Sequence, residues 1–189
     1  FAALPGANVD GINFAQEALR KGAIAILSHP EAQKHIDFPF EVIQLSDNNP
    51  RMCFAKLVAA FYQNQPKHVV AVTGTNGKTS VVSFLRQIWE FSGSNAASIG
   101  TLGVESNSLG KTISVKSSEA LTTPGPVQLH LFLSSLARSG VTHAAIEASS
   151  HGLNQYRLDG VKFSAAALTN FSHDHLDYHR TTREYLTAK

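Results

Sequence analysis

An apolar, β-branched run that leads directly into a glycine-rich loop is the feature that most constrains the fold of this chain. Residues 69–73 are Val-Val-Ala-Val-Thr, and residues 74–80 are Gly-Thr-Asn-Gly-Lys-Thr-Ser. A short apolar run bounded by turn residues is typical of a buried parallel strand. Apolar residues then recur at helical spacing over residues 80–91. The order of strand, loop and helix predicts a phosphate-binding loop.

The residue types of this loop suit a nucleotide. Gly74 and Gly77 permit backbone dihedral angles that let main-chain N–H groups approach phosphate oxygens. We expect Lys78 to neutralise the β and γ phosphates and the Thr79 hydroxyl to ligate magnesium. Only two residues separate the two glycines, against four in the common loop, so the alternative is an ordinary turn with a solvated lysine. The predicted nucleotide site consists of Gly74, Thr75, Asn76, Gly77, Lys78, Thr79 and Ser80.

Composition limits the class of protein. The chain has 189 residues, of which 43% are hydrophobic and 16% charged, as expected for a soluble globular protein of one or two domains. A net charge of +2, with no cluster of Lys and Arg, gives no indication of nucleic-acid binding. The lone cysteine, Cys53, cannot form an internal disulfide and fits a reducing compartment. Since no apolar run is long enough to cross a bilayer, we expect no membrane insertion and a cytoplasmic protein.

Both ends of the sequence look cut. The chain opens on Phe1 without an initiator methionine, and it closes on Lys189 inside a helical pattern that has no stop signal. We therefore expect a piece of a longer enzyme, inactive by itself.

The pattern along the chain predicts two α/β blocks that meet near Pro66. For block 1–66 we expect helices over 14–20 and 51–62 and strands over 23–27 and 40–45. Block 67–189 alternates strands with helices, as parallel sheets do. Its further expected elements are strands over 96–99, 143–147 and 163–169, a hairpin across 102–115 and a helix over 126–139. The predicted fold is a small N-terminal α/β domain followed by a P-loop-type central domain, whose mostly parallel sheet is flanked by helices.

A first group of polar residues follows the strand that ends at Glu147. A carboxylate there is placed to reach a metal held by Thr79, although a solvated strand end is the alternative. Ser149, Gln155 and Arg157 supply a hydroxyl, an amide and a guanidinium, which suit a phosphorylated or carboxylate-bearing substrate. A serine and a histidine are adjacent at 150–151, but no nucleophile elbow surrounds them, so a hydrolase built on them has little support.

Two further groups carry candidate chemistry. Residues 173–179 are His-Asp-His-Leu-Asp-Tyr-His, a density that indicates metal binding, acid–base work or a capped loop. A zinc hydrolase is an alternative, but Tyr178 interrupts the spacing that such a site requires. Thr122 and Thr123 precede Pro124, where they could cap a helix or bind substrate oxygens.

Four segments together resemble one family, the Mur ligases, and within it the MurE type that extends the peptidoglycan precursor peptide. The loop 73–79 alone is similar to a wider group that includes folylpolyglutamate synthetases. The Ser-Ser-His-Gly-Leu stretch at 149–153 gives the narrower resemblance, together with 122–124 and 169–179. The beginning of the chain resembles the family's N-terminal domain, which holds the uridine end of the substrate. The family's C-terminal domain, which selects the incoming amino acid, has no counterpart here.

The resemblance implies an ATP-dependent amide ligase. ATP would phosphorylate the glutamate γ-carboxylate of UDP-N-acetylmuramoyl-L-alanyl-D-glutamate, and the amine of a free amino acid would attack the acyl phosphate. Meso-diaminopimelate is the expected amino acid. The alternatives within this class are a ligase that adds L-lysine and another ligase of the Mur or folylpolyglutamate type. Alternatives of another class are a P-loop switch without ligase activity and the zinc hydrolase.

The same resemblance implies roles for individual residues. Thr79 and Glu147 would bind a first magnesium ion, and His175 and a carboxylated Lys189 a second, which makes Lys78, His175 and Lys189 the expected catalytic residues. Without the resemblance, Lys189 would be taken as a solvated helix lysine. The implied substrate-binding residues are Thr122, Thr123, Ser149, Gln155 and Arg157. Asn8 is a further candidate, in the stretch Ala7-Asn8-Val9 that replaces the histidine-containing turn which the family often has near uracil. A monomer is expected.

Overall fold

The computed structural model describes residues 1–6, 9–34, 37–107, 113–115 and 121–189. The chain forms two compact units, Phe1–Leu57 and Val58–Lys189, and the division falls within helix α3 (Pro50–Tyr62). The domain boundary expected at Pro66 lies shortly after this helix ends and stays a prediction.

The first unit is a small α/β unit. Strands β1 (Ala25–Ser28) and β2 (Ile43–Ser46) pair in parallel, and their core contains Ala3, Ile12, Ala15 and Ile26. The 3-10 helix η1 (Gly11–Phe14), α1 (Ala15–Arg20) and the unpredicted α2 (Pro30–Gln33) complete it. The strand expected over 40–45 begins only at Ile43, because Phe40 lies fully exposed in a turn.

The second unit is built on a six-stranded sheet with the order β6-β5-β4-β7-β3-β8. The neighbours β4, β7, β3 and β8 run parallel, whereas β5 pairs antiparallel with both β4 and β6. Both the mostly parallel sheet and the hairpin within 102–115 are therefore confirmed in the described residues. The strands are β3 (His68–Thr73), β4 (Ala96–Gly100), β5 (Gly103–Ser106), β6 (Ile113–Val115), β7 (His143–Glu147) and β8 (Ala165–Leu168).

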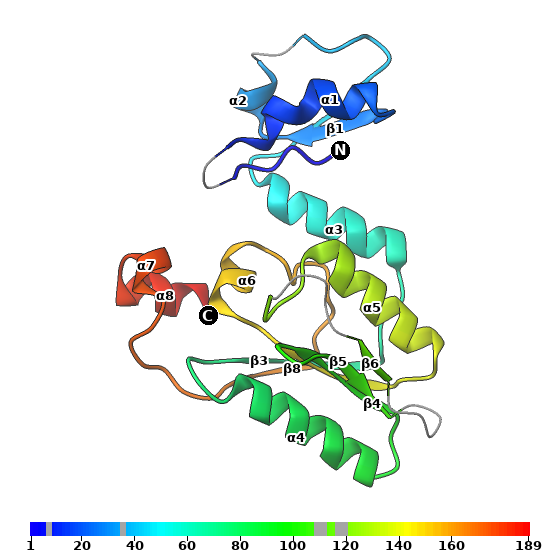
Figure 1. Ribbon diagram of the computed structural model, residues 1–189, viewed down its shortest axis with the longest axis vertical. Coiled ribbons are helices and arrows are strands. Elements are labelled where there is room, and N and C mark those ends of the chain that lie inside the picture. The colour runs from blue at the N-terminus through cyan, green and yellow to red at the C-terminus, as the bar shows by residue number, and fades with distance from the viewer. Residues whose placement is uncertain (7–8, 35–36, 108–112, 116–120) are drawn as a thin grey trace. The chain divides into compact units, whose positions relative to one another are not determined.

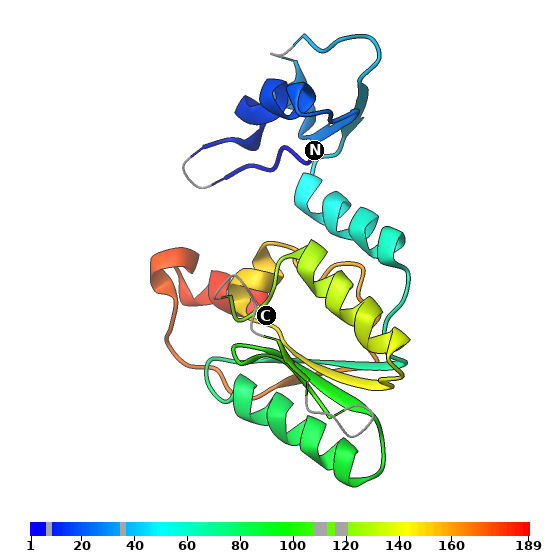
Figure 2. The ribbon, with the colours of Figure 1, turned by 45° about the vertical axis from the view of Figure 1, so that its right-hand side comes forward.

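Two helices cover opposite faces of this sheet, α4 (Lys78–Phe91) and α5 (Pro126–Arg138), as Figures 1 and 2 show. Under α5 the core includes Leu129, Leu133 and Ile146, all fully buried. Under α4 the sheet packs against Val82 and its apolar neighbours. Two of the apolar residues that recur at helical spacing over 80–91, Phe84 and Ile88, are nevertheless 60% and 59% exposed.

The parallel strands fix where the functional residues gather. Strands β3, β4 and β7 run in the same direction in adjacent positions, so their carboxyl ends meet at one edge of the sheet. That edge carries Thr73, Gly100 and Glu147, followed by the loops that connect to the helices. No helix in the described part of the chain is long and apolar enough to cross a membrane.

Candidate active site

The glycine loop lies between β3 and α4, in the predicted order of strand, loop and helix. Gly74 and Gly77 have φ angles of +141° and +83°, which side-chain-bearing residues rarely adopt. A Cβ atom on Gly74 would lie 1.9 Å from the Thr169 hydroxyl, so only glycine fits there. The helix begins at Lys78, two residues before the expected Ser80, which is exposed.

The loop is anchored by residues that follow β8. Asn170 accepts a hydrogen bond from the Asn76 main-chain N–H (3.0 Å), and the Thr169 hydroxyl donates to the Asn76 carbonyl (2.6 Å). Thr75 is buried, and its hydroxyl donates to the Ser172 carbonyl (3.2 Å). These contacts hold the loop against the segment that carries the predicted histidines.

Tyr185 is a contact of the loop that the sequence did not indicate. It lies on α8 (Thr182–Ala188), is fully buried, and has its hydroxyl 3.1 Å from that of Thr75. The Lys189 ammonium lies 4.7 Å from the centre of the Tyr185 ring, and the His175 ring lies 6.0 Å from it. Tyr185 therefore contacts the loop and both residues expected at the second magnesium.

Two ammonium groups meet at the start of the loop. Lys78 Nζ donates to the carbonyl oxygens of Gly74 and Thr75 (2.9 Å each), and Lys189 Nζ donates to the same Gly74 oxygen (2.8 Å). Lys189 Nζ also lies 3.3 Å from the Thr73 hydroxyl. Burial, and next the charge of Lys78, lower the pKa of Lys189 to about 8. Lys189 is thus not a solvated helix lysine.

Glu147 ends β7 as a buried carboxylate, 1% exposed, so the alternative of a solvated strand end is wrong. Its Oε2 accepts from the Thr79 hydroxyl (3.0 Å) and its Oε1 from the Thr101 main-chain N–H (2.9 Å). Thr79 and Glu147 thereby present adjacent oxygen donors, the kind of donor that magnesium prefers. The residues present fit a magnesium ion at this point.

Thr101 and its neighbour Gly100 were not predicted as site residues. A Cβ atom on Gly100 would lie 2.1 Å from Glu147 Oε1, so the absence of a side chain there makes room for the carboxylate. The only signal in the sequence is their position after a strand, at the edge where α/β sheets place ligands.

The predicted substrate residues form a second network beside Glu147. Thr123 is fully buried, donates from its hydroxyl to the Glu147 carbonyl (2.8 Å) and accepts from the Ser149 main-chain N–H (2.9 Å). Arg157 donates to the Thr123 carbonyl (2.8 Å) and, through two nitrogens, to Gln155 Oε1 (3.1 and 2.7 Å). The structure therefore brings four of the six substrate residues together.

Thr122 and Asn8 are the two predicted substrate residues outside this network. Thr122 lies 3.3 Å, hydroxyl to hydroxyl, from Thr101, next to this network. Neither Thr122 nor Thr123 caps α5, whose N-cap is Gly125 without a side-chain bond. Asn8 lies outside the described residues. Ser149 also has a structural role, because it caps the short helix α6 (Ser150–Asn154), for which the sequence pattern predicts no helix.

His151, His175 and His179 form an aromatic cluster. The ring of His151 lies 4.9 Å from that of His175 and 5.7 Å from that of His179, and His175 has a left-handed backbone (φ +51°). Burial, then the charge of His175, lowers the pKa of both His151 and His179. Within the ranges that the structure describes, no three His, Cys, Asp or Glu side chains are grouped to hold a metal, and nothing favours the zinc hydrolase.

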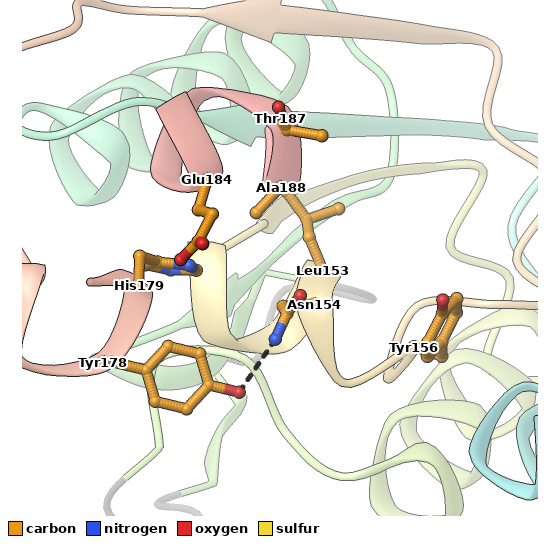
Figure 3. Close-up of a pocket in the computed structure, with 8 residues that line it drawn as sticks. All are labelled: Leu153, Asn154, Tyr156, Tyr178, His179, Glu184, Thr187 and Ala188. Carbon is orange, nitrogen blue, oxygen red and sulfur yellow. Dashed lines mark hydrogen bonds between the residues drawn. The ribbon is translucent and has the colours of Figure 1, made fainter. Parts of the chain in front are cut away.

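A cavity of about 670 Å³ adjoins this cluster, between α6, α7 (Leu176–His179) and α8 (Figure 3). The Tyr178 hydroxyl accepts hydrogen bonds from Asn154 (3.0 Å) and from Gln155 (3.3 Å), which ties α7 to the substrate network. Of the predicted groups only the segment 173–179 contributes to its lining, through Tyr178 and His179. Its lining is Leu153, Asn154, Tyr156, Tyr178, His179, Glu184, Thr187 and Ala188.

The fold and the loop together are those of a P-loop-type nucleotide-binding domain, preceded by a small α/β unit. Residues 72–189 match the family described as Mur ligase middle domain, and residues 1–67 match that described as Mur ligase family, catalytic domain. The chain belongs to the Mur ligase family.

Two similar proteins have the same name and function. The chain is 51% identical over 189 residues to UDP-N-acetylmuramoyl-L-alanyl-D-glutamate--2,6-diaminopimelate ligase of Brucella melitensis, covering all of this chain and 37% of that protein. It is 48% identical over 191 residues to the ligase of the same name from Zymomonas mobilis, again covering all of this chain and 37% of that protein. The chain therefore spans little more than a third of the length of these curated relatives.

Solved structures of Mur ligases superpose on the fold of this chain. A structure of UDP-N-acetylmuramoyl-L-alanyl-D-glutamate--2,6-diaminopimelate ligase superposes with a TM-score of 0.77 at 30% identity, covering all of this chain and 36% of that one. A MurF ligase from Thermotoga maritima in complex with ADP superposes at 0.59 with 19% identity, covering all of this chain and 38% of that one, which supports the fold alone.

Proposed function

We propose that the full-length protein is an ATP-dependent amide ligase that joins meso-diaminopimelate to UDP-N-acetylmuramoyl-L-alanyl-D-glutamate in peptidoglycan precursor synthesis. One observation supports this proposal above all: the Thr79 hydroxyl donates a hydrogen bond to the buried Glu147 carboxylate. The hydrogen-bond network of Thr123 and Arg157 lies beside that carboxylate. A nucleotide site and a site for an anionic acceptor would thus share one carboxylate. The similarity to two 2,6-diaminopimelate ligases favours diaminopimelate over L-lysine.

The loop would bind the phosphates of ATP. Main-chain N–H groups of residues 74–80 and the start of α4 suit phosphate oxygens. Lys78 would leave the loop carbonyls, to which it now donates, and neutralise the β and γ phosphates. Thr79 and Glu147 would hold magnesium, which when bound neutralises charge on the transferring phosphoryl group. The acceptor carboxylate can then approach a site in which anionic charge is already compensated.

The second network would bind the muramyl dipeptide. Arg157 and Gln155 form a rigid pair, since the guanidinium is held through two nitrogens. Thr122, Thr123 and Ser149 supply hydroxyls next to Glu147. This arrangement would hold the γ-carboxylate close to the γ phosphate, so that phosphorylation gives an acyl phosphate for the incoming amine to attack. Asn8 is a candidate contact of the uridine end by its position in the sequence alone.

Lys189 would carry a carboxyl group from carbon dioxide and act with His175 at a second magnesium. Only a neutral amine attacks carbon dioxide, and the pKa of about 8 makes the neutral form accessible near physiological pH. The modification would replace an ammonium that competes with Lys78 by an anionic oxygen donor that a hard cation prefers.

Residues 1–66 would form the UDP-binding domain and residues 67–189 the ATP-binding domain. The enzyme would act as a monomer in the cytoplasm, without nucleic acid and without insertion into a membrane, which fits a chain with a single cysteine.

The test is turnover of the full-length enzyme with ATP, magnesium and the muramyl dipeptide, with product detected by mass. We expect amide product with meso-diaminopimelate and much less with L-lysine. Product with L-lysine alone would contradict the amino-acid assignment, and ATP hydrolysis that ignores the dipeptide would favour the P-loop switch.

A further inference from the structure

The Thr101 hydroxyl lies between the Glu147 carboxylate, which contacts Thr79, and Thr122, which lies next to the predicted substrate residues. It is 3.2 Å from Glu147 Oε2 and 3.3 Å from the Thr122 hydroxyl. Thr101 is exposed on the turn after β4, so its hydroxyl is available to the site and supports no core packing. Its main-chain N–H makes a separate bond to Glu147 Oε1, which fixes the residue in place.

A hydroxyl has one proton and can donate it to only one of these two oxygens at a time. A free carboxylate is the stronger acceptor, because hydrogen bonds to ionised groups are about twice as strong as neutral ones. When Glu147 Oε2 binds a cation together with Thr79, that oxygen loses much of its strength as an acceptor. Donation by Thr101 to Thr122 then becomes the better alternative.

Thr101 is the donor in its contact with Thr122, as in its contact with Glu147. While its proton is given to Glu147, the Thr122 oxygen receives no hydrogen bond from Thr101. Once Thr101 donates to Thr122, the Thr122 hydroxyl is polarised and becomes the better donor to an anionic oxygen of the acceptor substrate.

We propose that Thr101 is a positioning residue that couples cation and nucleotide binding at Glu147 to hydrogen-bond donation by Thr122 toward the acceptor substrate. This inference rests on the proposed function and goes beyond it, because it predicts that the two ligands bind cooperatively through one hydroxyl. Linkage requires the effect to be the same in both directions.

The experiment uses the full-length protein and isothermal titration. The Kd of the muramyl dipeptide is measured without nucleotide and again with magnesium and the non-hydrolysable β,γ-imido analogue of ATP. The wild type is expected to bind the dipeptide about fivefold more tightly with the analogue, the effect of roughly one net hydrogen bond. Thr101→Val should bind it equally in both conditions, while Thr101→Ser should keep the difference.

Two further variants complete the design. Thr122→Val should also lose the difference, whatever its own affinity, because it removes the other end of the relay. Thr142→Val is the matched control, since Thr142 is an exposed threonine that precedes β7, at the opposite edge of the sheet. Wild-type cooperativity in Thr101→Val, or none in the wild type, would overturn the inference. A wild type that binds neither ligand would contradict the proposed function on which the inference rests.

Discussion

The side chains of Lys78 and Lys189 donate to the same oxygen, the Gly74 carbonyl, at 2.9 and 2.8 Å. Two ammonium groups on one acceptor repel each other, which adds to burial in lowering the pKa of Lys189 to about 8. Lys189 therefore loses its charge more readily than an ordinary lysine. This relationship is what makes its carboxylation testable.

We predict that Lys189→Ala inactivates the full-length enzyme and that short carboxylates such as acetate partly restore turnover. The small acid would return an anionic oxygen to the vacated position. The measurement is turnover of the variant with and without acetate. Full activity of Lys189→Ala without any addition would exclude Lys189 from the mechanism.

The pH dependence follows from the same pKa. At a fixed concentration of dissolved carbon dioxide, the carbamate signal of Lys189 in carbon-13 NMR should increase as pH rises from 7 to 9, since the neutral amine becomes more abundant. Without carbon dioxide, the unfolded chain binds more protons than the folded one above pH 8. The free energy of unfolding should then increase with pH from about 8 to 10.5. A carbamate signal that does not change with pH would argue against this account.

We predict that Lys78→Ala lowers ligation at saturating ATP by roughly 100-fold or more, because the phosphates lose their nearest point charge. Lys67→Ala is the control, since Lys67 is exposed at the opposite end of β3. Amide formation is measured for both variants. Near-normal turnover of Lys78→Ala would show that the loop does not bind the reacting phosphates.

Gly100→Ala should disturb Glu147 by direct contact. The added Cβ would lie 2.1 Å from Glu147 Oε1 and 2.5 Å from its Cγ, so the buried carboxylate must move. We expect weaker magnesium-dependent binding of the nucleotide and roughly 100-fold lower turnover, the cost of a displacement of about 1 Å in an active site. Gly125→Ala is the matched control, because nothing lies within 4 Å of a Cβ there. Equal behaviour of the two variants would disprove the packing argument.

We predict that Arg157→Ala weakens binding of the muramyl dipeptide by about 10- to 100-fold, as for a lost hydrogen bond to a charged group, with little change for ATP. Arg138→Ala, at the last residue of α5, is the control for removing an arginine. Both ligands are titrated separately into both variants. Equal losses for dipeptide and ATP would mean that Arg157 maintains the fold and does not recognise the substrate.

The sequence predicted the elements whose periodicity is strong, and it missed contacts that arise from strand register. The strand ending at Glu147 and the loop before α4 are locally encoded by apolar runs and glycines. Thr101 reaches Glu147 because β4 and β7 pair in parallel, with Ile99 opposite Ile146. That pairing joins residues far apart in the chain, and no local pattern indicates it.

The other differences between the predicted and the observed structure concern short helices and a side-chain contact between elements. Helices α2, α6 and α7 have four or five residues, too few to show a helical repeat. Tyr185 could be recognised as an apolar position in a helix, but its hydroxyl bond to Thr75 depends on how α8 packs against the loop. Tertiary packing, which the sequence does not reveal locally, completes the site.

The most direct test of the ligase mechanism is the fate of oxygen in the dipeptide γ-carboxylate. The substrate is labelled there with oxygen-18 and incubated with the full-length enzyme, ATP, magnesium and meso-diaminopimelate, and the released phosphate is analysed by mass. An acyl phosphate pathway predicts one labelled oxygen in each phosphate released with amide product. Unlabelled phosphate would contradict it, because the phosphoryl group would then have been transferred to water and not to the carboxylate.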